Sequence, residues 1–325
     1  MNRWALESIT AVSLGTRLGL LEKRLHRDSQ AFRIFQAIDD IFKGLDTLVT
    51  QFPYYRYVPT PTSRIFDNAG DTLVPILWRF TKDAVDAARA GGENSPNTTL
   101  LHHAWRNQKA GFKELFTFIH DLVISGANTT GAAASFALQR LATNPEVQEK
   151  ARQEVMSFSL AESQGSPDSS FESELPFLKA CIRETLRFHP IIPGVNLKLN
   201  QDVVMSGYHI PAGTVLRTEL YVAGQLEQHF TRPSEFLPER WLRSGDSASE
   251  DAWTLHPFAS LPFGIGPRTC IGKKIAEMEL CILLAAVLKK YRVENHHGDI
   301  GFLTQSTARP ERPAKFRFVE LNSTT

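Results

Sequence analysis

Apolar side chains recur at intervals of three and four along most of the first 190 residues, which is the spacing of one face of a helix. The pattern predicts helices over residues 4–14, 30–49, 63–90, 145–158 and 174–189. Pro75 lies inside the third of these, and we expect it to disturb that helix. Asn144 followed by Pro145 is typical of a helix start.

A longer helix is predicted from about residue 108 to residue 141. Its middle, SGANTTGAAAS (residues 125–135), consists almost entirely of small side chains and is flanked by large apolar ones. A stripe of small residues is also what a close helix crossing needs, so this segment alone does not identify a function.

The pattern changes after residue 200. Residues 201–224 alternate in polarity and are punctuated by turn residues, which indicates short strands, and residues 314–321 read as a final strand. Residues 232–245 are rich in proline and irregular. Residues 273–293 form an almost wholly apolar helix that we expect to be buried on most faces. The fold class is therefore mostly α, α+β by class.

The amino-acid composition excludes only a few classes of function. The net charge of +1 gives no global field for nucleic acid or for an acidic partner. Three cysteines are too few for a disulfide framework, and no apolar run approaches the roughly 20 residues of a membrane span. The first residues contain neither a secretory signal nor an Arg/Ser-rich transit peptide, so we expect no targeting sequence in this chain.

Cys270 stands in a loop rich in glycine, LPFGIGPRTCIGKK, directly before the apolar helix. Four roles are open to it. A zinc ligand would need partner cysteines or histidines, and a hydrolytic nucleophile would need a nearby base. A buried structural thiol would be ordinary for a lone cysteine. The fourth role is that of a thiolate ligand to a large cofactor.

The surrounding residues favour the fourth role. Glycines at 264, 266 and 272 remove side chains where a broad, flat group could approach the backbone. Arg268 can pair with a carboxylate of that group, and a following helix start stabilises a thiolate. A sulfur ligand of this kind is what an iron porphyrin requires.

The loop resembles the haem-binding loop of the cytochrome P450 family, the haem-thiolate monooxygenases. Five positions match at fixed spacing: Phe263, Gly266, Arg268, Cys270 and Gly272. The resemblance implies haem b (iron protoporphyrin IX) with Cys270 as axial ligand of the iron. It also suggests Lys198 as a partner of a haem propionate.

A second motif supports the resemblance. Glu184 and Arg187, in ETLRFHP, lie one turn apart on a helix, and in the family such a pair is joined by an arginine from an irregular loop. Arg240, in PSEFLPERW, supplies that third member. The resemblance gives the three a structural role.

The segment from Ser125 to Thr130 is similar to the family's small-Gly-x-acid-Thr-Thr sequence. By this resemblance Gly126 would open a groove for dioxygen, and Thr129 would donate a hydrogen bond to dioxygen. The family's usual acid is Asn128 here, and an amide cannot shuttle a proton as a carboxylate does. Monooxygenation remains the expectation, with a haem-thiolate isomerase or dehydratase as the alternative.

Basic residues near the loop suggest a branch of the family. Lys179, Arg183, Lys273 and Lys274 would ring the face next to the thiolate and suit an acidic electron donor. The branch that this resembles is mitochondrial, on the matrix side of the inner membrane. It implies a ferredoxin-type iron–sulfur donor, a steroid or other lipophilic substrate, and peripheral contact with the membrane.

The resemblance covers residues 1–325 as a single haem-thiolate domain, equivalent to the C-terminal two-thirds or so of the family's domain. The family's N-terminal helices and most of its main sheet have no counterpart in this sequence. A truncated chain without activity is therefore a third hypothesis.

Overall fold

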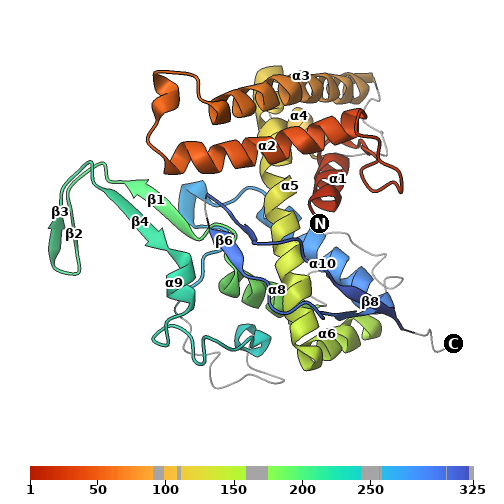
Figure 1. Cartoon of the computed structure of the whole chain (residues 1–325), viewed down its shortest axis with the longest axis vertical. Coiled ribbons are helices and arrows are strands. Elements are labelled where there is room, and N and C mark those ends of the chain that lie inside the picture. Colours follow the sequence, from red (N-terminus) through yellow and green to blue (C-terminus); the bar gives the residue numbers. More distant parts are fainter. Residues whose placement is uncertain are drawn as a thin grey trace. The chain divides into compact units, whose positions relative to one another are not determined.

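Helices lie where the three- and four-residue spacing of apolar side chains predicts them (Figure 1). The computed structural model describes residues 1–90, 99–107, 111–158, 175–242, 256, 258–304 and 306–321. The chain divides into two units, Met1–Ala132 and Ala133–Thr325, and the division falls within helix α5 (Phe112–Thr143). That the chain is one haem-thiolate domain stays a prediction.

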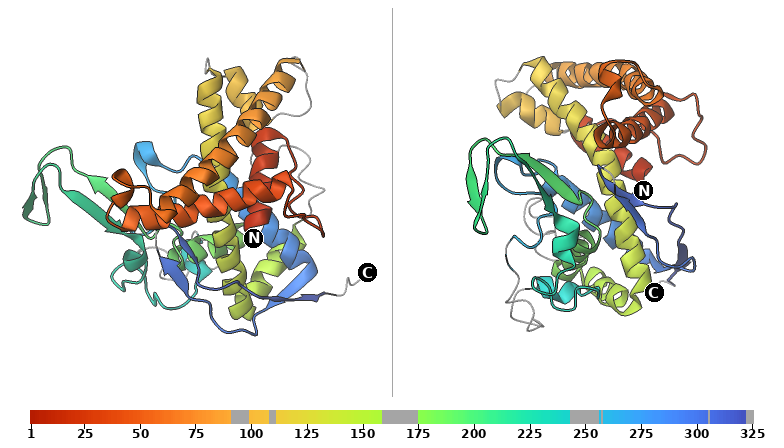
Figure 2. Two further views of the ribbon diagram at one scale, coloured as in Figure 1. Left: turned by 45° about the horizontal axis from the view of Figure 1, so that its top comes forward. Right: turned by 60° about the vertical axis from the view of Figure 1, so that its left-hand side comes forward.

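The first unit is helical. It contains α1 (Asn2–Leu14), α2 (Gln30–Thr50), the short 3₁₀ turn η1 (Tyr54–Arg56), α3 (Pro61–Ala90), α4 (Leu100–Asn107) and the start of α5. Helices α2 and α3 lie side by side (Figure 2) and bury apolar side chains such as Ile34, Ile38, Leu73 and Leu77. The start predicted for α5 at residue 108 lies outside the described residues.

The expectation that Pro75 disturbs its helix is wrong, because α3 is a single helix of 30 residues that contains Pro75 in its middle. A proline costs roughly 3 kcal/mol inside a helix because it removes one N–H and crowds the carbonyl four residues earlier. Here Pro75 is exposed, so water can solvate the Asp71 carbonyl that loses its partner. The burial of Leu73 and Leu77 on the opposite side offsets the cost.

The second unit combines helices with small sheets. Its helices are the end of α5, α6 (Pro145–Ser157), α8 (Pro176–Phe188), α9 (Leu220–Gly224) and α10 (Lys273–Lys290), with 3₁₀ turns η2 (Pro238–Trp241) and η4 (Gly266–Arg268). Glu154 fixes the start of α8, because its carboxylate accepts hydrogen bonds of 2.8 Å from Phe177 N and Leu178 N. Asn144 stands at the start of α6 as predicted, but its side chain donates to Arg140 O instead of capping the helix.

Every sheet among the described residues is a two-stranded antiparallel pair. The pairs are β1 (Gly194–Lys198) with β4 (Val215–Glu219), β2 (Val203–Met205) with β3 (Tyr208–Ile210), β5 (Tyr291–Glu294) with β8 (Arg317–Glu320), and β6 (Phe302–Thr304) with β7 (Ala308–Pro310). The prediction of a mostly helical α+β fold with small sheets is confirmed.

Helix α10 is buried on one face only, so the expectation of burial on most faces is wrong. Leu280, Leu284 and Leu288 are buried at helical spacing, whereas Met278 and Ile282 are 42% and 51% exposed. Apolar side chains therefore remain uncovered on the helix that follows Cys270. Within the described parts of the chain, each helix is too short or too polar to cross a bilayer.

Candidate functional site

The loop that carries Cys270 is held by its own backbone. Cys270 N donates to Phe263 O at 2.9 Å, and Thr269 donates to Gly266 O through both its N–H (3.0 Å) and its hydroxyl (2.8 Å). Gly264 and Gly266 adopt φ values of +71° and +75°, which side chains with a Cβ rarely tolerate. Gly264 and Gly266 are thus required by the shape of the loop, whereas Gly272, with a φ of −83°, is not.

Cys270 is the accessible cysteine of this chain. Its side chain is exposed, whereas Cys181 and Cys281 are buried. Burial raises the pKa of the Cys181 thiol well above its usual value, so this group stays protonated and inert. At Gly272 an added Cβ would lie 3.9 Å from the sulfur of Cys270, which is an ordinary contact distance.

The surroundings of Cys270 fit a broad apolar group with acidic substituents. Ile265 and Ile271, on either side of the sulfur in the sequence, are 57% and 68% exposed. Arg268 is exposed and forms no ion pair with another residue in the described ranges, so its guanidinium is available to a carboxylate. Lys273 Nζ lies 5.8 Å from the ring centre of Phe263. An accessible sulfur, an uncovered apolar rim and an available guanidinium are together what a haem requires.

Lys198, the suggested propionate partner, is exposed at the end of β1, where it pairs with Val215. No hydrogen bond or ion pair between described residues joins it to the cysteine loop. Its assignment stays a prediction.

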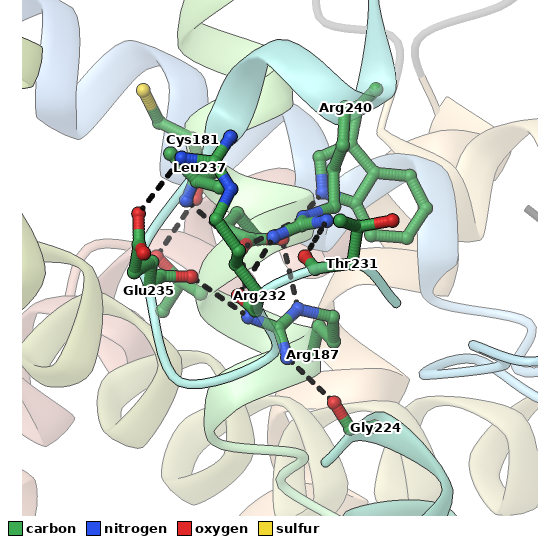
Figure 3. A network of polar contacts seen from close by, with 11 residues as sticks. Cys181, Arg187, Gly224, Thr231, Arg232, Glu235, Leu237 and Arg240 are labelled. Carbon is green, nitrogen blue, oxygen red and sulfur yellow. Dashed lines mark hydrogen bonds and ion pairs between the residues drawn. The ribbon is translucent and has the colours of Figure 1, made fainter. Parts of the chain in front are cut away.

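The structure brings Glu184, Arg187 and Arg240 together in one buried network, and Figure 3 shows the two arginines with their main-chain partners. Arg187 donates two hydrogen bonds to the Glu184 carboxylate, from Nε (3.0 Å) and from Nη2 (2.8 Å). Arg240 Nε donates to the same carboxylate at 3.2 Å. Four further guanidinium N–H groups donate to the main-chain oxygens of Gly224, Thr231, Arg232 and Glu235. The network therefore fastens the irregular segment around η2 to helix α8.

Two further donors to Glu184 were not predicted from the sequence. Trp241 Nε1 donates to Oε2 at 2.8 Å, and Leu237 N donates to Oε1 at 3.0 Å. Trp241 directly follows Arg240 in the sequence. This position next to Arg240 was the only signal that could have indicated Trp241 as a partner of Glu184. With these two donors, the buried charge of Glu184 is fully hydrogen-bonded.

Three of the four basic residues predicted to surround the thiolate line one cavity beside the cysteine loop. Lys179, Arg183 and Lys273 border a space of about 220 Å³ together with Phe263 and Gly264, and Glu277 adds one acid. Lys274 is exposed but does not border this cavity. The structure thus gathers positive charge within a single hollow of the second unit.

Residues 125–132 of the small-residue segment of α5 lie in the first unit, where Gly126 packs against helix α1. A Cβ at this position would lie 3.2 Å from Ile9 Cγ1 of α1. The glycine therefore accommodates the neighbouring helix, and its role in opening a groove for dioxygen stays a prediction.

Asn128 and Thr129 both have hydrogen-bond partners. Asn2 Nδ2 donates to Asn128 Oδ1 at 2.9 Å, a contact that the sequence did not predict. The Thr129 hydroxyl donates to Ser125 O at 2.6 Å, one turn earlier in α5. The Thr129 hydroxyl can donate to a ligand only if its hydrogen bond to Ser125 O is broken. Its oxygen lone pairs can accept a hydrogen bond from a ligand without that change.

Comparison with known families gives a match over almost the whole chain. The sequence model of the family described as Cytochrome P450 matches residues 1–318. Among curated proteins, a probable cytochrome P450 49a1 of Drosophila melanogaster is 34% identical over 97% of this chain and 54% of its own length. Cytochrome P450 CYP12A2 of Musca domestica is 32% identical over 99% of this chain and 62% of its own length.

A human protein and a solved structure are also similar to this chain. The 25-hydroxyvitamin D-1 alpha hydroxylase, mitochondrial, of Homo sapiens is 31% identical over 98% of this chain and 62% of its own length. A cytochrome P450DA heme domain superimposes with a TM-score of 0.78 at 22% identity, covering 99% of this chain and 67% of that one. This chain therefore spans a little more than half the length of the curated relatives that it matches.

Proposed function

This chain belongs to the cytochrome P450 family, and on that premise we propose that it is the haem-binding part of a monooxygenase that hydroxylates a lipophilic substrate. The observation that carries the proposal is the accessible Cys270 in a loop shaped by Gly264 and Gly266. Members of the family bind haem, and when bound, its iron supplies the reduction of dioxygen and the insertion of one oxygen atom into a C–H bond.

In this proposal each group of residues has a separate task. Cys270 supplies the sulfur ligand, and Arg268, with Lys198, neutralises the carboxylates of the cofactor. The network around Glu184 keeps η2 and the residues before it in place, and Trp241 of η2 borders the same cavity as Phe263 of the cysteine loop. Gly266 and Gly272 leave space for the cofactor, and Phe263 packs at the edge of the loop.

We assign hydrogen bonding on the oxygen side to Asn128 and Thr129. The alternative, an isomerase or dehydratase that needs no delivered proton, is favoured by one observation, the amide in place of an acid at position 128. Replacing Asn128 with Asp separates the two. Under the monooxygenase hypothesis, coupled substrate hydroxylation rises, whereas an isomerase gains nothing from the added acid.

Electrons would come from an acidic ferredoxin-type iron–sulfur protein that docks over Lys179, Arg183, Lys273 and Lys274. The cavity that three of these residues share with Phe263 supports this docking site. The names of several relatives include the word mitochondrial, which supports a location on the matrix side of the inner membrane.

The substrate class follows from the relatives and from one exposed surface. The human relative is named as a hydroxylase of a vitamin D derivative, which supports a steroid or similar lipid. The connection between α2 and α3 exposes Phe52 (64%), Tyr54 (61%), Tyr57 (78%) and Val58 (60%). Aromatic side chains of this kind favour a membrane interface, where such a substrate would dissolve.

The deciding experiment is the absorbance difference spectrum of the haem-reconstituted chain, reduced with dithionite, with and without carbon monoxide. A strongly red-shifted Soret band is expected, and it should disappear in Cys270→Ser while persisting in the matched control Cys281→Ser. A chain that takes up no haem would overturn the proposal and support the hypothesis of an inactive fragment. A band that survives in Cys270→Ser would overturn the assignment of the ligand.

A further inference from the structure

The first turn of α1 packs closely against α5, next to Asn128 and Thr129, the proposed oxygen-side residues. A Cβ at Gly131 would lie 2.3 Å from Asn2 Oδ1, 2.8 Å from Asn2 Cα and 2.9 Å from Asn2 N. Seven residues further along α1, Ile9 meets α5 again at Gly126. The two contacts run in opposite directions along the two helices, so α1 crosses α5 antiparallel and Asn2 is confined against the α5 backbone.

This crossing fixes the amide of Asn128. An asparagine side chain has one oxygen that accepts and one nitrogen that donates. Asn2 Nδ2 donates to Asn128 Oδ1 at 2.9 Å, in a partly buried contact between residues 126 positions apart. Within the described ranges, no group accepts a hydrogen bond from Asn128 Nδ2. The nitrogen of Asn128 is therefore the end left for a ligand.

We propose that Asn2 is a positioning residue for Asn128: it holds Oδ1, so that the amide presents a hydrogen-bond donor to whatever binds on the oxygen side. Thr129, whose hydroxyl proton is committed to Ser125 O, presents an acceptor beside it. The two residues together then order a water or a ligand between a donor and an acceptor. This inference rests on the proposed function, because it assumes that residues 125–130 face the oxygen side.

Two substitutions at position 2 change the hydrogen bond in different ways. The carboxylate of Asn2→Asp can only accept a hydrogen bond. We therefore expect the Asn128 amide to rotate by about 180°, so that Nδ2 donates to this carboxylate and Oδ1 faces the ligand. An acid in the first turn also suits the dipole of α1, so this variant should fold. Asn2→Leu removes the hydrogen bond altogether and leaves the amide unoriented. Ile9→Val is the matched control, because it trims the other contact of α1 with α5 and leaves the amide alone.

The main readout is the infrared stretching band of carbon monoxide bound to the reduced, haem-loaded chain. A donor that faces the ligand lowers this frequency, and an acceptor raises it. The band should shift to higher frequency in Asn2→Asp, broaden in Asn2→Leu and stay in place in Ile9→Val. If the band of Asn2→Asp coincides with that of the unmodified chain, the positioning role is wrong.

A second measurement separates this inference from the proposed function. Urea unfolding of the haem-free chain with Asn2→Leu, Asn128→Leu and both together tests the contact without any cofactor. We expect the losses of stability to be non-additive. Additive losses would overturn the inference even if the red-shifted Soret band is present. Absence of that band from the unmodified chain would instead overturn the proposed function, and the assignment of Asn2 with it.

Discussion

Trp241 Nε1 donates a hydrogen bond of 2.8 Å to Glu184 Oε2, so a single buried carboxylate holds an indole as well as two guanidinium groups. The indole ring also packs on Phe230, with ring centres 6.1 Å apart. Because Trp241 and Arg240 belong to the same short turn, Glu184 fixes that turn at two successive residues. The turn then cannot rotate without leaving part of the buried charge unpaired.

Replacing Trp241 with Phe should lower the free energy of unfolding by about 1.5–3 kcal/mol, the usual contribution of a hydrogen bond to a charged group. Urea denaturation measures the loss. Trp4→Phe is the control, since this half-buried indole forms no hydrogen bond with another described residue, and its effect should be smaller. Equal losses in the two variants would mean that ring volume, rather than the bond to Glu184, determines the effect.

Gly131→Ala should destabilise the first unit by roughly 1–3 kcal/mol, the range for overpacking. The added methyl carbon would lie 2.8 Å from Asn2 Cα, and main-chain atoms cannot move aside as a side chain can. Gly70→Ala is the matched control, because Gly70 is also inside a helix but has no atom within 4 Å of an added Cβ. That variant should gain about 0.5–1 kcal/mol. Thermal unfolding of the pair checks the contrast.

His189 should make the folded state less stable as the pH falls. Its ring is stacked on Phe136 at 4.4 Å, and Nε2 accepts a hydrogen bond of 3.0 Å from Arg140 Nε. Burial first, and the charge of Arg140 second, lower the pKa of His189 from 6.5 to about 3, with Asp299 opposing and Arg187 adding to the shift. Between these two pKa values the unfolded chain binds a proton that the folded chain does not, so stability rises with pH.

The slope attributable to His189 is at most about 1.4 kcal/mol per pH unit over that window. Carboxylates titrate in the same range, so the measurement is a difference between the unmodified chain and His189→Phe, which keeps a ring against Phe136. Urea midpoints between pH 4 and pH 7 should depend less on pH in the variant. Parallel pH profiles would show that His189 is protonated in the fold.

The sequence predicted the positions of most helices because burial of one apolar face dominates their local energetics. It failed at Pro75 and on the exposed side of α10, where the outcome depends on which side faces solvent and on what covers it. Motif spacing was sufficient to single out Cys270 and to pair Glu184 with Arg187 and Arg240, but it did not indicate Trp241 or Leu237 as partners of Glu184. No local pattern could indicate that Asn2 meets Asn128 or that Gly126 faces Ile9, because these contacts join segments more than a hundred residues apart.

Positive charge collects beside the cysteine loop from two helices. Lys179 and Arg183 come from α8, Lys273 begins α10, and all three border one cavity, so an acidic side chain entering it could meet several cations at once. Lys289 and Lys290 are exposed at the other end of α10, about 24 Å along the helix from Lys273 at 1.5 Å per residue. Helix α10 thus provides one test position, Lys273, and both controls.

Reversing the charge of Lys179, Arg183 or Lys273 to Glu should raise the KM for an acidic ferredoxin by up to about fivefold per residue, the limit for a partly solvated ion pair of 1 kcal/mol. Substrate turnover at saturating ferredoxin should change little, because these side chains act on docking. The increase should shrink in high salt, which screens the attraction. Lys289→Glu and Lys290→Glu carry the same change of net charge, so an equal rise in KM there would mean that overall charge, rather than this cavity, recruits the donor.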